Sequence, residues 1–253
     1  MSERSSSLPA IKPTISIVFP AYQEEKRIGM TMESWATYLD THHPGTEVVV
    51  VTDGCKDNTA KVALDTFKSA NCSLRLIEIS ENQGKGNAVK VGVMEAQGNI
   101  IVFTDSDLSY EPQLLDEFLA KIEDGADLVI AQRRKKTQYP GLGRRLLAML
   151  SRFLVGNFVV PGIRDTQAGF KVFKKESAHQ LFPLARTKRF LFDLEILVIA
   201  KEHHCKIEKV YVDWQDRDGS TVRIFIDTLR SLRDLVLIYT RMLFGAYKLK
   251  EKN

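Results

Sequence analysis

The stretch "NIIVFTDSDLSYEP", residues 99–112, decides the fold of this chain. The four apolar residues at 100–103 are typical of a buried strand, and two carboxylates, Asp105 and Asp107, follow with only Ser106 between them. The pair has no cation nearby in sequence, so the repulsion between the two charges needs an explanation. One interpretation is a solvated turn or a helix cap, where Asp and Ser are common. The other is a divalent metal held by carboxylate oxygens.

Apolar runs alternate with helical patterns along the first half of the chain. Strand-type runs occupy residues 14–22, 47–54, 74–80, 100–106 and 127–133. Apolar residues at helical spacing occupy 24–42, 57–70, 87–98 and 111–123. This β-α alternation predicts an α/β fold in which helices cover both faces of a parallel sheet.

A polar cluster follows each predicted strand at its carboxyl end. The clusters are "PAYQEE", "TDGCKDNT", "ENQGKG", "TDSDLS" and "QRRKK", in chain order. Ligands of open α/β sheets bind outside the carboxyl ends of the strands. Because parallel strands bring these ends to one edge, the clusters together favour a ligand site and strengthen the metal interpretation of the acid pair.

Two of these clusters offer groups suited to a nucleoside. "FPAYQEE" places Pro20, Tyr22 and Glu24 at a strand exit, where they form either a structural turn or a base and ribose site. In "TDGCKDNT", Asp57 fits a helix cap. Asp53 is less easily assigned to a cap and is suited to accept a hydrogen bond from a nucleobase.

The "GKG" turn brings a cation and backbone N–H groups to one point. Lys85 lies between two glycines just ahead of a predicted helix, an arrangement suited to phosphate. The spacings G-x-x-x-x-G-K-[ST] and G-x-G-x-x-G are absent. The sequence therefore does not support a P-loop kinase or ATPase, or a dinucleotide-binding dehydrogenase. A diphosphate bridged by a metal to Asp105 and Asp107 remains, because Mg²⁺ is usually held by carboxylates together with substrate phosphates.

Basic residues are concentrated after the fifth predicted strand. They are Arg133, Arg134, Lys135, Lys136, Arg144 and Arg145. A solvated loop is one interpretation, and an anion cradle is the other, because guanidinium groups suit phosphate oxygens. Further along, "VDWQDRDGSTVR" at 212–223 is typical of a loop after a short strand and offers Arg217 and Arg223 for an anion.

Two later segments set acids among apolar residues. "GIRDTQAGFKVF" at 162–173 contains Asp165, and "KRFLFDLEIL" at 188–197 contains Asp193 and Glu195. Carboxylates are seldom buried without a task, and carboxylates with perturbed pKa values cluster at functional sites. We therefore expect these acids to lie near the site.

The bulk composition excludes several classes of protein. A chain of 253 residues, 44% of them hydrophobic, is long enough for one large α/β core. The net charge of +4 is too diffuse to indicate a nucleic-acid partner. Three cysteines without metal-type spacing favour a reducing compartment and no disulfide framework. We expect residues 1–13 to be a flexible lead-in, neither signal peptide nor membrane anchor.

Two segments, 144–162 and 232–250, are strongly apolar but interrupted by arginines. Neither reaches the roughly 18 uninterrupted apolar residues that a spanning helix needs. Packing inside the protein is one interpretation. The other is an amphipathic helix in a membrane interface, where apolar faces are flanked by Arg, Lys and aromatic residues.

Taken in order, the strand with "PAYQEE", then "TDGCKDNT", "GKG" and the Asp-x-Asp of "TDSDLS" resemble the family 2 inverting glycosyltransferases of GT-A fold. "GIRDTQAGFKVF" and "RFLFDLEIL" are similar to the polyprenyl-phosphate glycosyltransferases, and within them to the dolichyl-phosphate β-glucosyltransferases. The resemblance covers about residues 14–250. It implies a GT-A (Rossmann-like), mixed but mostly parallel sheet with C-terminal amphipathic helices. It also implies one domain over 14–253, with a nucleotide-sugar half (14–132) and an acceptor half (133–253).

The resemblance also implies roles by position. The donor would be bound by Pro20, Tyr22, Glu24, Asp53, Lys85, Asp105, Ser106 and Asp107, of which Asp105 and Asp107 would ligate Mg²⁺ or Mn²⁺. The lipid phosphate would be held by Arg133, Arg144, Arg145 and Arg217. The implied catalytic set is Asp107, Arg133, Asp165 and Glu195. A phosphate monoester is already an anionic nucleophile, so no acid receives a compulsory role as base.

Three positions depart from the family pattern. Thr52 replaces the first acid before Gly54, Ser109 stands where mannose-transferring relatives carry glutamine, and Thr221 replaces a lysine. Ser109 weakens the case for mannose. At Thr221 either Arg223 substitutes for the missing lysine or the contact is lost.

The expected function is inverting transfer of glucose from UDP-glucose to a polyprenyl (dolichyl) phosphate, at the cytoplasmic face of a membrane to which the protein attaches peripherally. The alternatives are transfer of mannose from GDP-mannose or of N-acetylglucosamine to the same lipid, and a soluble family 2 enzyme acting on a glycan or protein. A non-catalytic nucleotide-sugar sensor is a further alternative from another class.

Overall fold

The protein was analysed as a computed structural model, which describes residues 14–69, 71–134, 160, 162–163, 165–213 and 224–248. In this part of the chain seven strands form one sheet in the order β3-β2-β1-β4-β6-β5-β7. The strands are β1 (Ile15–Ala21), β2 (Glu47–Asp53), β3 (Ser73–Ile79), β4 (Ile100–Thr104), β5 (Leu128–Arg133), β6 (Phe170–Lys174) and β7 (Ile207–Val212). Only β6 runs antiparallel to its neighbours, β4 and β5; the other pairs are parallel. The mixed, mostly parallel sheet is therefore confirmed.

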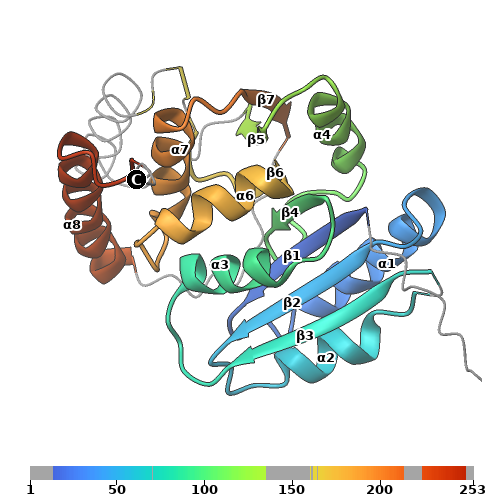
Figure 1. Ribbon diagram of the computed structural model, residues 1–253. Coiled ribbons are helices and arrows are strands. Elements are labelled where there is room, and N and C mark those ends of the chain that lie inside the picture. Colours follow the sequence, from blue (N-terminus) through green and yellow to red (C-terminus); the bar gives the residue numbers. More distant parts are fainter. Residues whose placement is uncertain are drawn as a thin grey trace, which may run out of the picture.

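Helices cover both faces of the sheet, as predicted (Figure 1). They are α1 (Ile28–His42), α2 (Thr59–Thr66), α3 (Lys85–Glu95), α4 (Leu114–Glu123), α6 (Lys175–Leu181), the 3-10 turn η2 (Phe182–Leu184), α7 (Phe192–Glu202) and α8 (Ile224–Leu243). Alternate residues of β2 belong to two cores. Val48 and Val50 lie in the core that includes α1 and α4, whereas Val49 and Val51 lie in the core that includes α3 and α7. Burial on both faces explains why this strand is a continuous apolar run.

The predicted helices of the first half are confirmed, but they begin at slightly different residues. The helix expected over 24–42 begins at Ile28. Before it, residues 24–28 form a turn, in which the backbone N–H of Ile28 donates to the carbonyl of Glu24 at 2.9 Å. The helix expected from 57 begins at Thr59, and Asp57 accepts the backbone N–H of Thr59 at 3.2 Å. The cap position itself is Asn58, so Asp57 satisfies the first N–H of the helix from one residue before the cap.

The order of strands creates a switch point between β1 and β4. From β1 the chain winds outward through β2 and β3, and then returns to the other side of β1 to form β4. The helices that follow β1 and β4 therefore leave in opposite directions and open a crevice at the carboxyl ends of these strands. The sheet also spans the boundary predicted near residue 132, because β6 from the second half lies between β4 and β5.

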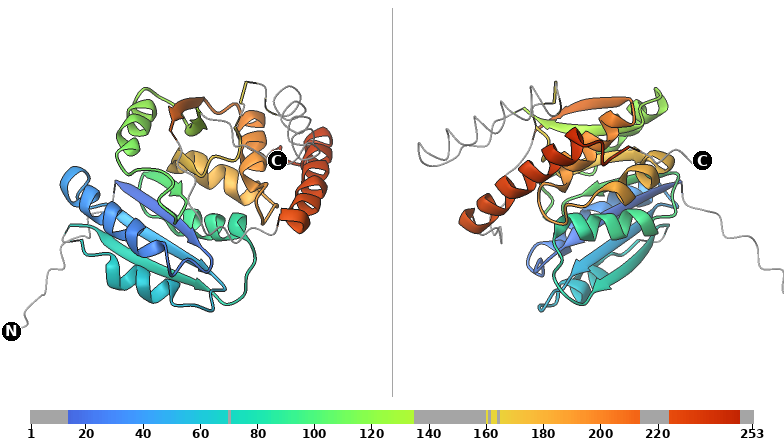
Figure 2. Two further views of the ribbon diagram at one scale, coloured as in Figure 1. Left: turned by 180° about the vertical axis from the view of Figure 1, so that it is seen from behind. Right: turned by 60° about the vertical axis from the view of Figure 1, so that its left-hand side comes forward.

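The C-terminal helix α8 lies at the periphery of the molecule, beside α7 (Figure 2). One side of it is buried at Ile238, while several large apolar side chains remain exposed. These are Leu232, Val236, Leu237, Tyr239 and Leu243, followed after the helix by Phe244. Among the described residues no helix is both long and apolar enough to span a membrane. Residues 1–13, most of the apolar segment 144–162, and 214–223 lie outside the described part of the chain.

Candidate active site

The polar clusters after the first four strands meet at one edge of the sheet, as predicted. β1 ends at Ala21, β2 at Asp53, β3 at Ile79 and β4 at Thr104, and the four strands are parallel. The groups brought together are therefore the ones that follow these residues directly. The crevice between β1 and β4 lies at the centre of this edge, where a ligand of an open α/β sheet binds.

Asp105 and Asp107 leave the end of β4 with their carboxylates partly exposed. The Lys85 ammonium lies 2.5 Å from Asp105 Oδ1, and the Arg27 guanidinium lies 3.7 Å from Asp107 Oδ2. The side chains of Asp105 and Asp107 are 26% and 23% exposed. The acid pair therefore has two cations that the local sequence does not reveal, and it keeps oxygen surface for a ligand.

Lys85 is held at the start of α3. The helix begins at Lys85 itself, which corrects the expectation that the helix begins after the "GKG" turn. Gly84 precedes the helix with φ 107°, a conformation that residues with a side chain rarely adopt. Burial opposes the charge on the lysine, but the carboxylates of Asp105 and Asp193 outweigh it and raise the pKa of Lys85. Lys85 is therefore a permanent cation at this edge.

Gly169 presses directly against Asp105. A Cβ atom at position 169 would lie 1.9 Å from Asp105 Oδ2, and the backbone N–H of Asp105 donates to the Gly169 carbonyl at 3.1 Å. The N–H of Gly169 in turn donates to the Tyr110 hydroxyl at 3.1 Å. The sequence singled out the surrounding segment but not this contact. The absence of a side chain at 169 is what lets the carboxylate take its place.

The turn after β1 places a second carboxylate near the pair. Glu24 forms a fork with Arg27, whose Nε donates to Glu24 Oε2 at 2.6 Å. Burial raises the pKa of Glu24, with the nearby charges of Asp107 and Asp105 adding to the effect and Arg27 opposing it. Arg27 thus bridges Glu24 and Asp107, a role that sequence reasoning missed because a single arginine at a helix start carries no motif.

Asp53 organises the loop that carries Lys85. Its carboxylate accepts the backbone N–H groups of Gln83 at 2.8 Å and Gly84 at 2.7 Å, and the side chain is buried. The structure therefore gives Asp53 a local role in shaping the phosphate-type turn. Its contact with a nucleobase stays a prediction.

Three further residues expected to bind the donor lie within β1, directly after β1 and after β4. Pro20 is a buried residue inside β1, not at the strand exit as expected, and it lies opposite Val51. Tyr22 follows the strand and is partly exposed. Ser106 is buried, and its carbonyl accepts the Thr31 hydroxyl at 2.8 Å. Of the three, Tyr22 is the one with an exposed aromatic ring, and its contact with a base stays a prediction.

Arg133 and Asp165, both placed in the implied catalytic set, form one ion pair. Arg133 Nε lies 2.5 Å from Asp165 Oδ2 and Arg133 Nη2 lies 2.9 Å from Oδ1. The Gln132 amide also donates to the backbone carbonyl of Asp165, at 2.9 Å. This bidentate geometry fixes the plane of the guanidinium at the end of β5.

Asp193 is buried against Lys171 in the sheet. The Lys171 ammonium donates to Asp193 Oδ1 at 2.5 Å and to the Ala168 carbonyl at 2.7 Å, and it lies 5.1 Å from the centre of the Phe103 ring. Burial raises the pKa of Asp193, while Lys171 and Lys85 act in the opposite direction. Lys171 was not singled out from the sequence, because a lysine inside an apolar strand usually points to solvent.

Glu195 is fully buried, with 0% of its side chain exposed, and four groups donate to its carboxylate. Its place in the catalytic set stays a prediction, and the structure shows it as a hydrogen-bonded residue of the interior. The acceptor-side predictions for Arg144, Arg145 and Arg217 lie outside the described residues.

The acid pair fits a divalent metal. Partly exposed carboxylate oxygens are the ligands that Mg²⁺ and Mn²⁺ prefer, and two of them suffice where substrate phosphates complete the shell. Within the part of the chain that the structure describes, no group of three or more His, Cys, Asp or Glu side chains could hold a metal ion. A metal at Asp105 and Asp107 would take its remaining ligands from water or from a substrate phosphate.

The open α/β sheet with an exposed acid pair at its switch point defines a nucleotide-dependent class of protein. Residues 16–182 match the family described as glycosyl transferase family 2. The chain belongs to this family and is a glycosyltransferase, which confirms the resemblance seen in the sequence.

Comparisons with known proteins identify similar chains. A dolichyl-phosphate beta-glucosyltransferase of Drosophila melanogaster is 33% identical over 251 residues, covering 93% of this chain and 77% of the relative. The protein of that name from Mus musculus is 34% identical over 268 residues, covering 98% and 83%.

Solved structures of similar fold include glucosyl-3-phosphoglycerate synthase from Mycobacterium tuberculosis. Its complex with Mg²⁺ and uridine-diphosphate has a TM-score of 0.68 at 19% identity, covering 95% of this chain and 81% of that one. Its complex with Mn²⁺, uridine-diphosphate-glucose and phosphoglyceric acid has a TM-score of 0.68 at 20% identity, covering 95% and 82%. At this identity the likeness concerns the fold, and it confirms the GT-A architecture.

Proposed function

We propose that this glycosyltransferase moves glucose from UDP-glucose to a polyprenyl phosphate of the dolichyl type, with inversion, to give a β-linked lipid-phosphate sugar. The observation that carries the proposal is similarity over nearly the whole chain to relatives named dolichyl-phosphate beta-glucosyltransferase. The exposed acid pair at the switch point supports the nucleotide-diphosphate part of the proposal.

The donor would lie along the edge formed by β1, β2 and β4. Tyr22 offers a face for the base, Glu24 a carboxylate for the ribose, and Asp53 holds the turn beside them. Asp105 and Asp107 would hold Mg²⁺ or Mn²⁺, which when bound neutralises charge on the departing diphosphate. Lys85, 2.5 Å from Asp105, adds a fixed positive charge where that diphosphate would lie.

The acceptor would be placed by the end of β5. Arg133 has its guanidinium plane fixed by Asp165, so it presents donors in a defined direction. Arg144, Arg145 and Arg217 are proposed to complete the phosphate site. An ionised phosphate monoester is a nucleophile without further deprotonation, so positioning is the main task of these residues. Attack from the face opposite the diphosphate converts an α-linked donor to a β-linked product.

The isoprenoid chain requires a route from a membrane to the site. The exposed apolar side chains of α8 and Phe244 form a surface suited to a lipid interface. Arg230 and Arg233 on the same helix suit anionic headgroups. The protein would thus associate peripherally with the cytoplasmic face of a membrane.

Transfer to lipid tests the proposal. The protein is incubated with dolichyl phosphate and labelled UDP-glucose, GDP-mannose or UDP-N-acetylglucosamine, with Mn²⁺ or with EDTA, and lipid-extractable label is counted. We expect label from UDP-glucose alone, only with metal, and none with Asp107→Asn. Label from another donor would reassign the sugar, and no lipid-linked label from any donor would refute the function.

Flotation tests the membrane part separately. Vesicles with anionic lipid should carry the protein upward, and Val236→Ser with Leu243→Ser should reduce the floated fraction without lowering the melting temperature. A matched double variant at exposed polar positions, Lys201→Ser with Glu202→Ser in α7, should float like the parent. Equal flotation of both variants would exclude α8 as the contact.

A further inference from the structure

Glu195 joins three parts of the chain at one buried carboxylate. Its Oε2 accepts the backbone N–H groups of Arg186 at 2.8 Å and Thr187 at 2.6 Å. Its Oε1 accepts Arg241 Nη1 at 3.0 Å and the Tyr247 hydroxyl at 2.6 Å. Helix α7, the loop that precedes it and the C-terminal segment therefore share a single set of hydrogen bonds.

The loop held by Glu195 packs against the start of α3. The carbonyl of Lys188 accepts the backbone N–H of Asn87 at 3.0 Å. A Cβ atom at Gly84 would lie 2.5 Å from the Lys188 carbonyl oxygen, and one at Gly86 would lie 2.8 Å from the Thr187 carbonyl oxygen. The two glycines on either side of Lys85 are thus required by the loop backbone, which occupies the space that side chains would take.

Lys85 connects the loop contacts to the acid pair. Lys85 begins α3 between the two glycines and lies 2.5 Å from Asp105 Oδ1. A shift of the loop would move residues 84–87, and with them the ammonium that faces Asp105. Since the loop itself is anchored on Glu195, the position of Lys85 depends on a carboxylate that is fully buried.

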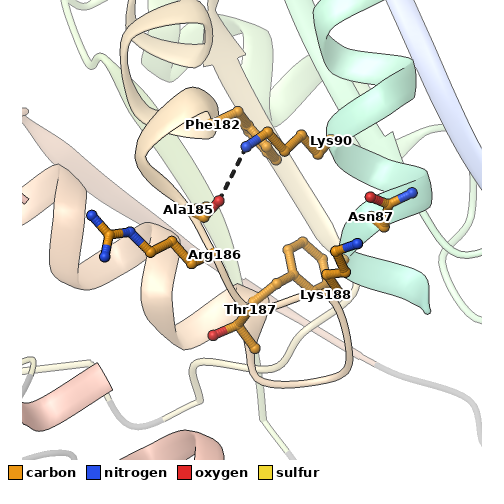
Figure 3. Close-up of a pocket in the computed structure, with 9 residues that line it drawn as sticks. Asn87, Lys90, Phe182, Ala185, Arg186, Thr187 and Lys188 are labelled. Carbon is orange, nitrogen blue, oxygen red and sulfur yellow. Dashed lines mark hydrogen bonds between the residues drawn. The ribbon is translucent and has the colours of Figure 1, made fainter. Parts of the chain in front are cut away.

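A cavity of about 160 Å³ lies between the loop and α3, lined by residues of both. Figure 3 shows Lys90 extending from α3 to the loop, where its ammonium donates to the carbonyl of Ala185 at 3.1 Å. The same ammonium donates to the carbonyl of Pro183 in η2 at 3.2 Å. Hydrogen bonds to Glu195, Lys90 and Asn87 therefore hold the loop beside this cavity.

We propose that Glu195 is a positioning residue that ties the C-terminal segment, through Arg241 and Tyr247, to the donor-side turn at residues 84–87. Glu195 holds the loop, the loop holds the turn, and the turn directs Lys85. The identity of the ligand that Lys85 meets rests on the proposed function; the coupling itself does not.

Tyr247→Phe tests the coupling with a minimal change, because it removes only the hydroxyl that donates to Glu195. The matched control is Tyr211→Phe, at an exposed tyrosine of β7. We expect Tyr247→Phe to speed backbone amide exchange in residues 84–88 and to raise the KM for UDP-glucose by about fivefold, the effect of one hydrogen bond. The KM for the lipid acceptor should stay unchanged, and Tyr211→Phe should behave like the parent.

Arg241 provides a second, independent variant. Arg241→Met should reproduce the exchange and KM effects, and Arg241→Lys, which restores a donor, should reverse most of them. Unchanged amide exchange at 84–88 in both Tyr247→Phe and Arg241→Met would overturn the proposal, as would equal increases in the KM of donor and acceptor. If the parent transfers no glucose, the proposed function fails, while the exchange comparison still decides this inference.

Discussion

Asp105 and Asp107 keep 26% and 23% of their side chains exposed, whereas Asp193 and Glu195 keep 3% and 0%. All four acids lie near the same sheet, but their partners differ. The first two face cations at the open crevice of the switch point. The other two are enclosed, Asp193 by the Lys171 ammonium and Glu195 by four hydrogen-bond donors.

We propose that the difference separates acids able to bind a ligand from acids that hold the scaffold. An enclosed carboxylate has already exchanged its water for protein donors, and removing a partner leaves a costly buried charge. An exposed carboxylate can still exchange water for a metal or a phosphate-bound ion. Substitutions of the exposed acids should therefore act directly on ligand binding, whereas substitutions around the enclosed acids should act through the scaffold, on stability and on the side chains that it positions.

The largest expected effect is at Asp107. Asp107→Asn removes one of the two proposed carboxylate ligands with no change in size. Glucose transfer should fall by more than roughly 100-fold, because even residues that only support a metal ligand contribute about 10–100-fold to metal affinity or activity. Steady-state transfer with UDP-glucose and dolichyl phosphate measures it. The control is Asp213→Asn, at an acid that directly follows β7 and is 72% exposed. This variant should keep parental activity. Equal activity of the two variants would refute the ligand role.

Gly169→Ala should have the next largest effect. Its Cβ atom would meet Asp105 Oδ2 at 1.9 Å, so the carboxylate must move away from its present position. Gly169 positions Asp105, a proposed metal ligand, and does not bind the metal itself. We therefore expect glucose transfer to fall by about 10–100-fold. Gly29→Ala, where the nearest atom of Val62 lies 3.3 Å from the new Cβ, serves as the control in α1. Parental activity of Gly169→Ala would show that the contact does not fix the acid.

Lys171→Met should affect stability instead. It leaves Asp193 buried without its cation, which should lower the free energy of unfolding by about 3–5 kcal/mol. Burial already raises the pKa of Asp193, and the loss of Lys171 raises it further. The folded variant then holds a proton that the unfolded chain releases above about pH 4, so its stability should fall as the pH rises above that value. Urea unfolding at several pH values measures both effects.

The pairing control is the double variant Lys171→Met with Asp193→Asn. It removes the buried charge together with its partner, and should recover part of the lost stability and lose the added pH dependence. A Lys171→Met protein as stable as the parent at neutral pH would contradict the assignment of Asp193 to the scaffold.

The smallest expected effect is at Arg134. Its ion pair with Asp213 is 3.2 Å long, and both side chains are more than half exposed. Exposed pairs contribute at most about 1 kcal/mol, so Arg134→Gln should barely change unfolding or transfer. A large loss of transfer would show instead that this basic residue takes part in the acceptor site.

The donor edge was predictable because its signals are local. Strands β2 and β4 are mostly apolar runs, and the residues after their ends reach the edge, so "TDSDLS" located Asp105 and Asp107 without a structure. The positions of Lys85 and Asp53 at the same edge followed from the same rule, but the hydrogen bonds of Asp53 to the turn at 83–84 did not. The start of α3 at Lys85 was missed, since a glycine-flanked residue gives a weak helix signal.

The second half was less predictable because its pairs are long-range. Lys171 and Asp193 are 22 residues apart, and Arg133 and Asp165 are 32 apart. No periodicity links such residues, so the sequence indicated that the acids mattered but not which cation each would meet. Glu195 was placed in the catalytic set by the family resemblance. Its contacts with Arg241 and Tyr247, which lie 46 and 52 residues away, were not visible in the sequence.

Metal-dependent binding of UDP tests most directly the central claim that the exposed acids bind the ligand. Calorimetry would compare UDP affinity with Mn²⁺ and with EDTA for the parent, Asp107→Asn and Asp165→Asn. We predict that Mn²⁺ strengthens UDP binding at least about tenfold in the parent and in Asp165→Asn, and that this gain disappears in Asp107→Asn. A gain that persists in Asp107→Asn, or that is absent from the parent, would contradict the account.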